Sequence, residues 1–137
     1  MGTATVQWIS GQKFIGIDST NHSVVLSTPD EGVGIKPSDL MLVAIAAYTA
    51  VDVVDILAKK HCCLESLVIQ SSGEQDADPP WTFRKFHLKY ILKGKGLNAK
   101  NVDQTIKLSE EKYCSVAATV RGVAQVDYEF EILPEEE

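Results

Sequence analysis

The stretch from Lys36 to Lys60 constrains the fold of this chain more than any other part of the sequence. After Pro37 it contains no glycine or proline, and its residues are mostly Ala, Leu, Val and Ile. Between Leu40 and Ala58 the strongly polar side chains are few: Thr49, Asp52 and Asp55. Pro37 suits a first helical turn, and two lysines follow where the last carbonyl groups would lie. The pattern predicts one long helix.

The predicted helix is apolar around most of its circumference. Every side chain from Leu40 to Ala47 is apolar, and a polar stripe begins only at Tyr48 and continues through Asp52. The fully apolar part is shorter than the roughly 20 residues that a bilayer requires, so we expect no membrane span. Such a helix must be covered on most sides, and 137 residues leave little to cover it with. We therefore infer a partner subunit in a homodimer.

Alternating apolar and polar residues predict strands on both sides of this helix. The segment before it reads as a meander of three short strands. The elements expected after it are strands at 64–75 and around 86–93, helices at 100–112 and 115–120, and a last strand at 124–132. Because the strands are grouped around helices instead of alternating with them, we expect an α+β fold with antiparallel sheets around a central buried helix.

Length and composition indicate one domain, which we expect to span residues 1–134 before an acidic tail at 135–137. The net charge is −6 and the only arginines are Arg84 and Arg121, so nucleic-acid binding is not expected. The first residues show neither a basic segment nor an apolar signal run, which favours a cytoplasmic protein. In that reducing compartment the three cysteines should be free thiols.

Cys114 is the most interesting single residue. It lies between two predicted helical segments, and if it caps the second, the helix amides there favour a thiolate with a lowered pKa. The alternative is that Cys114 packs in the core as a small apolar side chain. Both interpretations remain open at this point.

Two other groups of side chains contain residue types that can form a site. His61, Cys62 and Cys63 are metal-ligand types, but adjacent residues do not easily face one ion and no second cysteine pair exists, so we expect no metal site. Tyr48 and Asp52 are one helical turn apart and could share a hydrogen bond. A catalytic use of this pair is possible, but a polar patch at a subunit interface is the simpler interpretation.

The chain resembles the OsmC/Ohr family, the osmotically inducible and organic-hydroperoxide-resistance proteins. The resemblance rests on the N-terminal meander, the helix entry KPSDL at 36–40, the apolar helix after it, and the motif EKYCSV at 111–116. It covers nearly the whole chain and is greatest to an OsmC-like branch with KYCSV as its second motif. The resemblance implies an OsmC-like fold and an intertwined homodimer.

The better known relatives are thiol peroxidases that use a reactive and a resolving cysteine. By the resemblance, the resolving cysteine falls on Cys114, and the reactive one falls on Tyr48, whose phenol has no sulfenic acid cycle. A glutamate of the peroxidase site falls on Ser38, with Asp39 beside it, and no arginine precedes Arg84. Catalytic candidates are therefore Cys114 and Tyr48, with substrate contacts expected from Ser38, Asp39 and Asp52.

Two functional hypotheses follow, beside a purely structural one in which the interface is packed solid and the protein acts through some partner. The first is a protein of the hydroperoxide-stress class whose peroxidase activity is lost, or weak and dependent on Cys114. It would act on an organic hydroperoxide, with a dithiol as reductant and no cofactor. The second is a non-enzymatic dimer that binds a small hydrophobic molecule at the interface cleft.

Overall fold

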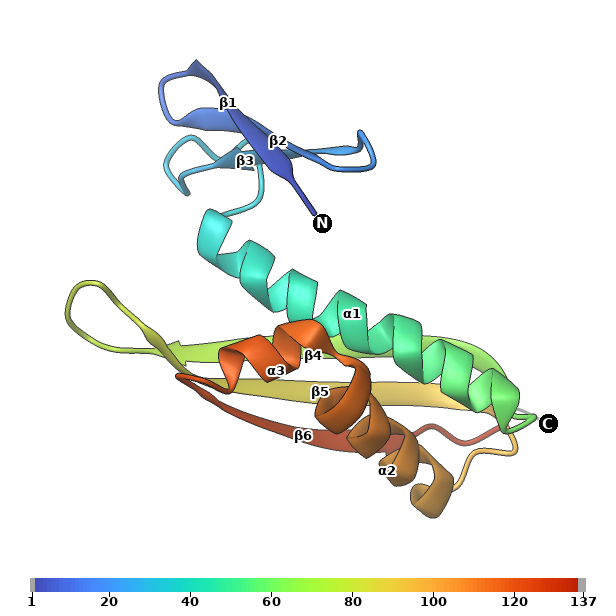
Figure 1. Cartoon of the computed structure of the whole chain (residues 1–137). Coiled ribbons are helices and arrows are strands. Elements are labelled where there is room, and N and C mark those ends of the chain that lie inside the picture. The colour runs from blue at the N-terminus through green and yellow to red at the C-terminus, as the bar shows by residue number, and fades with distance from the viewer. Residues whose placement is uncertain (1, 136–137) are drawn as a thin grey trace. The chain divides into compact units, whose positions relative to one another are not determined.

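The computed structural model describes residues 2–135, which form an α+β fold (Figure 1). Its elements in chain order are β1 (Ala4–Ser10), β2 (Lys13–Asp18), β3 (Ser23–Ser27), α1 (Pro37–Lys59), β4 (Cys63–Gln75), β5 (Phe83–Lys95), α2 (Ala99–Leu108), the π-helical turn η1 (Ser109–Tyr113), α3 (Ser115–Val120) and β6 (Gln125–Ile132). The α+β class predicted from the sequence is confirmed.

The chain divides into two compact units, one ending at Met41 and one beginning at Leu42. The boundary lies within α1, close to its start. The expectation of a single domain over 1–134 stays a prediction. Of the acidic tail expected at 135–137, only residue 135 lies inside the described residues.

The first unit contains the predicted three-stranded meander. β1 pairs antiparallel with β2, and β2 pairs antiparallel with β3. Gly11, with a φ of 53°, makes the tight turn between the first two strands. The Trp8 indole donates a hydrogen bond to the Gly11 carbonyl across that turn, at 2.8 Å. The period-two pattern therefore located these strands correctly.

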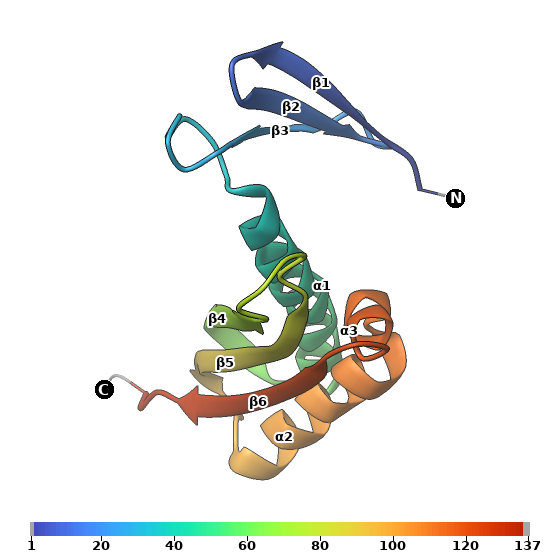
Figure 2. The same cartoon turned by 90° about the vertical axis from the view of Figure 1, so that its left-hand side faces the viewer.

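The second unit is a sheet of order β4-β5-β6 with the helices on one face (Figure 2). β4 and β5 are antiparallel, as predicted, but β5 and β6 are parallel, so the all-antiparallel prediction is wrong for this pair. The chain between β5 and β6 passes through α2, η1 and α3. A crossover of that length returns the chain to the end at which β5 began, and β6 therefore runs in the same direction.

The core of the second unit lies between the sheet and the helices. The predicted alternation along β5 is confirmed, because Phe86, Leu88, Tyr90 and Leu92 are buried while the residues between them line the outer face. α1 covers this core with a single stripe of fully buried residues one turn apart: Ile45, Thr49, Val53 and Leu57. Burial at a spacing of four fixes which side of α1 faces the sheet.

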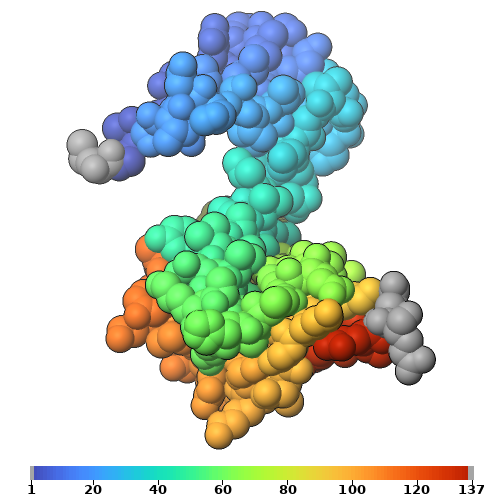
Figure 3. Space-filling view, turned by 90° about the vertical axis from the view of Figure 1, so that its right-hand side faces the viewer, coloured from blue at the N-terminus to red at the C-terminus, as the bar shows by residue number. Residues whose placement is uncertain are grey.

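The opposite side of α1 is uncovered within the second unit (Figure 3). Val51 is 70% exposed and Tyr48 is 42% exposed, and Val43 and Val54 are also exposed. The sequence predicts that a partner subunit covers this side, so the burial of α1 on most sides stays a prediction. α1 is also long and apolar enough to cross a membrane. The expectation that it is too short for a membrane span therefore does not hold. The core helix of a soluble protein passes the same test.

The helices after β5 differ from the prediction in one respect. α2 begins where expected, with Asn98 as N-cap in a capping box with Asn101. It ends at Leu108, however, and the predicted continuation to Lys112 is instead the π-turn η1. A π-turn inserts one extra residue into a helical turn and is common at functional sites.

The outer face of the β5–β6 pair carries a ladder of opposite charges. Lys85 contacts Asp127, His87 contacts Asp127 and Glu129, and Lys89 contacts Glu131. Hydrogen bonding to Asp127, and then to Glu129, raises the pKa of His87 above its ordinary value. Hydrogen bonding to His87 likewise lowers the pKa of Asp127. Charges on neighbouring strands therefore support the parallel register.

We expect Asp127→Asn to lower the free energy of unfolding by roughly 0.5 kcal/mol between about pH 4 and pH 6.5, the size of a solvent-screened pair. Because the pKa of His87 is raised in the folded state, His87 stabilises the fold fully below about pH 6.5. This stabilisation is lost as the pH rises through the folded-state pKa. Because the pKa of Asp127 is lowered in the folded state, Asp127 stabilises the fold above about pH 3.9. This stabilisation is lost as the pH falls through its folded-state pKa. Urea denaturation across this range measures the difference.

The matched control is Asp78→Asn, which removes an exposed carboxylate from the β4–β5 loop. Its unfolding curve should follow that of the wild type at every pH. Near pH 9 the deficit of Asp127→Asn should shrink to the part that comes from Lys85. An Asp127→Asn deficit that does not change with pH would show that His87 contributes nothing.

Candidate functional site

Cys114 lies where η1 ends and α3 begins, and it is 2% exposed. Its backbone N–H donates to the Ser109 carbonyl at 2.7 Å, which closes the π-turn. Its Sγ accepts a hydrogen bond from the Ala117 N–H at 3.3 Å, so Cys114 is the N-cap of α3. The predicted capping position is therefore confirmed.

The predicted thiolate is not supported. Burial raises the pKa of Cys114 above that of an ordinary thiol, and the N–H groups of Ala117 and Val116 only partly offset this effect. The negative charges of Asp52 and Glu110 raise the pKa further. The expectation of a lowered pKa is wrong because the effect of desolvation exceeds the effect of hydrogen bonds from two backbone N–H groups at the start of α3. Cys114 belongs to the apolar core, as the alternative interpretation proposed.

Glu110 is a buried carboxyl group that sequence reasoning missed. It is 2% exposed and accepts a hydrogen bond from the Tyr90 hydroxyl at 3.1 Å. Burial raises its pKa, and burial also raises the pKa of Tyr90. In the sequence Glu110 stands in the charged run SEEK, which is typical of a solvated helix face. One periodicity signal could have placed it inside, because Glu110 follows Val102 and Ile106 at steps of four residues, on the buried face of α2.

Asp52 connects α1 to the same turn. Its carboxylate accepts a hydrogen bond from the Ser109 hydroxyl at 2.9 Å, and Ser109 is fully buried. The proposed hydrogen bond between Tyr48 and Asp52 does not occur in the described part of the chain. Tyr48 lies instead on the uncovered side of α1. The structure thus brings Asp52, Glu110 and Cys114 together around η1, and leaves Tyr48 at the surface.

The remaining predicted site residues belong to the first unit. Ser38 is half-buried and Asp39 is exposed, both in the first turn of α1. Asp39 is an acidic residue at the helix N-terminus, where negative charge is favourable. Their contribution to a substrate site stays a prediction.

The two other thiols lie at the far end of α1. Cys62 is half-buried, its Sγ donates to the Gly96 carbonyl at 3.4 Å, and it accepts from the Asn101 amide at 3.6 Å. Cys63 is exposed at the start of β4. Residues 2–135 contain no group of three or more His, Cys, Asp and Glu side chains arranged to hold a metal ion. The three thiols are free, as predicted.

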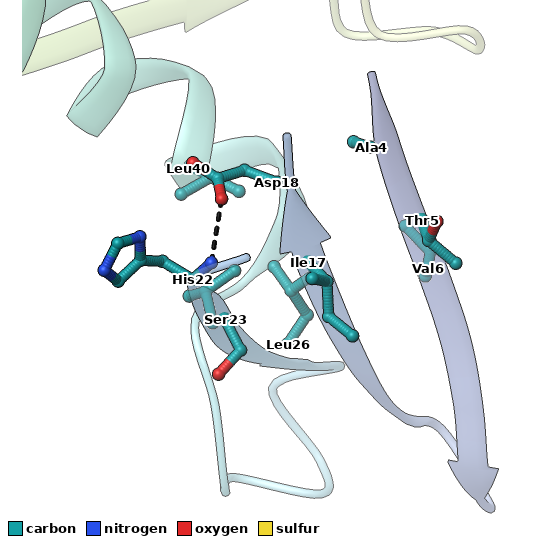
Figure 4. A pocket seen from close by; sticks show the side chains of 11 residues that line it. Ala4, Thr5, Val6, Ile17, Asp18, His22, Ser23, Leu26 and Leu40 are labelled. Carbon is teal, nitrogen blue, oxygen red and sulfur yellow. Dashed lines mark hydrogen bonds between the residues drawn. The ribbon is translucent and has the colours of Figure 1, made fainter. Parts of the chain in front are cut away.

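An apolar hollow of about 370 Å³ lies in the first unit, between the three strands and Leu40 (Figure 4). Ala4, Val6 and Leu26 contribute apolar walls. At one end Asp18 accepts a hydrogen bond from the His22 backbone N–H at 2.9 Å. The hollow is mostly apolar and has no cysteine in its lining, so it can take part in packing or apolar binding but not in thiol chemistry.

Comparison with known proteins gives a consistent result. The profile of a family described as OsmC-like protein matches residues 28–129. The protein YhfA of Escherichia coli is 27% identical over 130 residues, which cover 95% of this chain and 97% of YhfA. A crystal structure of a hypothetical protein from Aquifex aeolicus has a TM-score of 0.89 at 29% identity and covers 99% of this chain and 98% of its own.

A third structure is more distant in sequence. The organic hydroperoxide resistance protein OhrB of Bacillus subtilis has a TM-score of 0.65 at 16% identity. The alignment covers 96% of this chain and 98% of OhrB. At that identity the similarity establishes a common fold.

We expect Cys63 to react with N-ethylmaleimide at least about tenfold faster than Cys114 in the native protein at neutral pH. Cys63 is exposed, whereas Cys114 is buried and its thiol ionises less readily than an ordinary one. Peptide mass spectrometry after timed labelling measures both rates. Denaturation in urea before labelling is the control, since it should make the two rates similar. Labelling of Cys114 as fast as Cys63 in the native protein would contradict the described burial.

Proposed function

The chain belongs to the OsmC-like protein family, and on this basis we propose a homodimer of the organic-hydroperoxide defence class with lost or weak thiol peroxidase activity. Any remaining turnover would depend on Cys114. The substrate would be an organic hydroperoxide, the reductant a dithiol, and the compartment the cytoplasm. The name of the structurally similar OhrB supports the substrate class.

The observation that carries this proposal is the contrast between Tyr48 and Cys114. The family resemblance puts the reactive thiol at Tyr48, where a phenol stands on the uncovered side of α1. A phenol cannot attack a peroxide and be recycled through a sulfenic acid. The remaining thiol at Cys114 is buried, and burial raises its pKa, so it is a poor nucleophile at neutral pH.

The uncovered side of α1 supports the homodimer. Monomeric soluble proteins rarely expose a large continuous apolar patch. Val43, Val51 and Val54 form such a surface on the helix that also carries Tyr48. A second copy offers the same surface, and two copies related by a two-fold axis would cover each other.

With cumene hydroperoxide and dithiothreitol, we expect slow turnover by the wild type and none by Cys114→Ser. Tyr48→Cys should raise the rate on the order of tenfold or more, because it restores a thiol at the position of the reactive cysteine. Hydroperoxide consumption followed by a colorimetric assay measures the rates. Cys63→Ser is the matched control and should keep the wild-type rate, since Cys63 is exposed at the start of β4 and is not part of the turn that carries Cys114.

Turnover that persists unchanged in Cys114→Ser would contradict this proposal. If the wild type shows no turnover and Tyr48→Cys does, the scaffold is intact and lacks only the reactive thiol at position 48. That result would favour the second candidate function.

The second candidate is binding of a small hydrophobic molecule at the dimer interface. The specific observation in its favour is that the uncovered side of α1 combines apolar side chains with one hydroxyl, that of Tyr48. Ligand sites are mostly apolar and contain a few polar groups that orient the ligand. A buried, weakly ionised Cys114 is compatible with this function, because binding requires no nucleophile.

We expect native mass spectrometry to detect a medium-chain fatty acid, added as a probe, on wild-type dimers. Val51→Asp should reduce the bound fraction on the order of tenfold, because it puts a charge on the apolar side of α1. Val68→Asp is the matched control, since Val68 is exposed on β4 and pairs with Ile91, away from the buried residues of β5. Equal retention by both variants would contradict binding at α1.

A further inference from the structure

Trp81 is a large apolar side chain in the loop that joins β4 to β5. It is 55% exposed, and the two residues before it, Pro79 and Pro80, are exposed as well. The loop projects beyond the sheet of the second unit (Figure 1). Within residues 2–135 the Trp81 indole N–H has no hydrogen-bond partner. The loop therefore presents one aromatic ring and one unused donor to solvent.

The loop holds Trp81 in a fixed and strained backbone conformation. Its φ is 53°, a left-handed value that bulky residues rarely adopt. The Trp81 N–H donates to the Asp78 carbonyl at 2.9 Å, and the Trp81 carbonyl accepts from the Gln75 side chain at 3.0 Å. Arg84 closes the base of the loop with an ion pair to Asp76 at 3.0 Å. Backbone strain of this kind is concentrated at functional positions, and a pre-organised side chain loses little entropy on binding.

The apolar hollow of the first unit has the size and the chemistry to accept such a side chain. Its volume is about 370 Å³, and Val6, Leu26 and Leu40 contribute apolar walls (Figure 4). Asp18 lies at one end, and within the described chain its Oδ2 atom accepts a hydrogen bond only from the Thr20 hydroxyl. A carboxylate oxygen can accept more than one hydrogen bond, so a position remains for an indole N–H.

The occupant that the molecule itself offers is the Trp81 ring of a second copy. Trp81 is exposed in its own chain and does not line the hollow. The hollow is continuous with the surface proposed for the dimer, because Leu40 lies on α1 about one turn before Val43. Two copies related by a two-fold axis would make this contact twice. Tryptophan side chains that fill pockets are typical of the strongest contacts in protein interfaces.

We propose that Trp81 of each copy inserts into the hollow of the other copy's first unit, with its ring on the apolar walls and its indole N–H donating to Asp18. This inference rests on the proposed homodimer and names the segments of the two copies that meet. Hydrogen bonds from the His22 N–H and from Thr20 lower the pKa of Asp18, so its carboxylate is charged at neutral pH and is a strong acceptor.

The test uses the full chain with Trp8→Phe, in which Trp81 is the only tryptophan. Sedimentation equilibrium measures the mass of this parent protein, and acrylamide quenching of its fluorescence measures the accessibility of Trp81. In the dimer the quenching constant should be at least about threefold lower than in the same protein unfolded in urea, because an interface pocket shields the ring from solvent.

Mixed dimers identify the chain that supplies the pocket. The parent is refolded with a large excess of copies that carry Trp8→Phe, Trp81→Phe and Val6→Asp, and native mass spectrometry verifies the mixed dimer. Val6→Asp puts a charge on a wall of the hollow, so the quenching constant of Trp81 should rise toward the unfolded value. The matched control partner carries Gln7→Asp in place of Val6→Asp. Gln7 is the next residue of β1 and does not line the hollow, so Trp81 should stay protected.

A dimer in which Trp81 is as accessible as in the unfolded protein would overturn the inference and leave the homodimer standing. Protection that persists with the Val6→Asp partner, or that is lost equally with the Gln7→Asp partner, would also overturn it. If Val6→Asp copies do not fold or pair, Ala4→Phe takes their place with the same expected result, because it fills the hollow from the start of β1. A parent with the mass of one chain would contradict the homodimer and this inference together.

Discussion

The structure depends on a helix, α1, that is covered on only one side by the rest of the second unit. The buried stripe of α1, from Ile45 to Leu57, closes the core above the β4-β5-β6 sheet. The other side presents Val51 and its apolar neighbours to solvent. Burial of apolar surface is the main favourable contribution to folding, and a helix of this kind leaves much of its apolar surface exposed. The uncovered side is therefore the strongest argument for a second copy.

The same helix also explains how the fold and the chemistry are connected. Asp52 lies beside the buried stripe of α1 and accepts a hydrogen bond from Ser109. Ser109 is the residue at which the regular helix α2 ends and the π-turn begins. That turn carries Glu110 into the core and ends at Cys114. Two of the polar groups at this turn are held by a hydrogen bond to another element: Ser109 donates to Asp52 of α1, and Glu110 accepts from Tyr90 of β5. Partly buried polar groups in such a network specify one arrangement of the core.

Much of the fold could be predicted from the sequence, because its strongest signals are local. The period-two pattern of β5, the capping residue Asn98 and the short helix after Cys114 all depend on neighbouring residues. The parallel pairing of β6 could not be predicted in the same way. It depends on where the crossover helices deliver the chain, although the opposite charges of β5 and β6 are visible in the sequence.

The candidate site was predicted less well, because its properties come from burial. The position of Cys114 at a helix start was foreseen, but the direction of its pKa shift was not, since desolvation exceeds the effect of two amides. Glu110 was missed because a charged run normally faces solvent, although its spacing of four residues from Ile106 places it on the buried face of α2. Both errors arise where tertiary packing overrides a local preference.

Sedimentation equilibrium of the wild-type protein at micromolar concentration tests the central claim most directly. If a second copy covers the apolar side of α1, the measured mass will be twice the 15.0 kDa of one chain. A stable, folded species with the mass of a single chain would contradict the account, because the exposed valines of α1 would then have no partner.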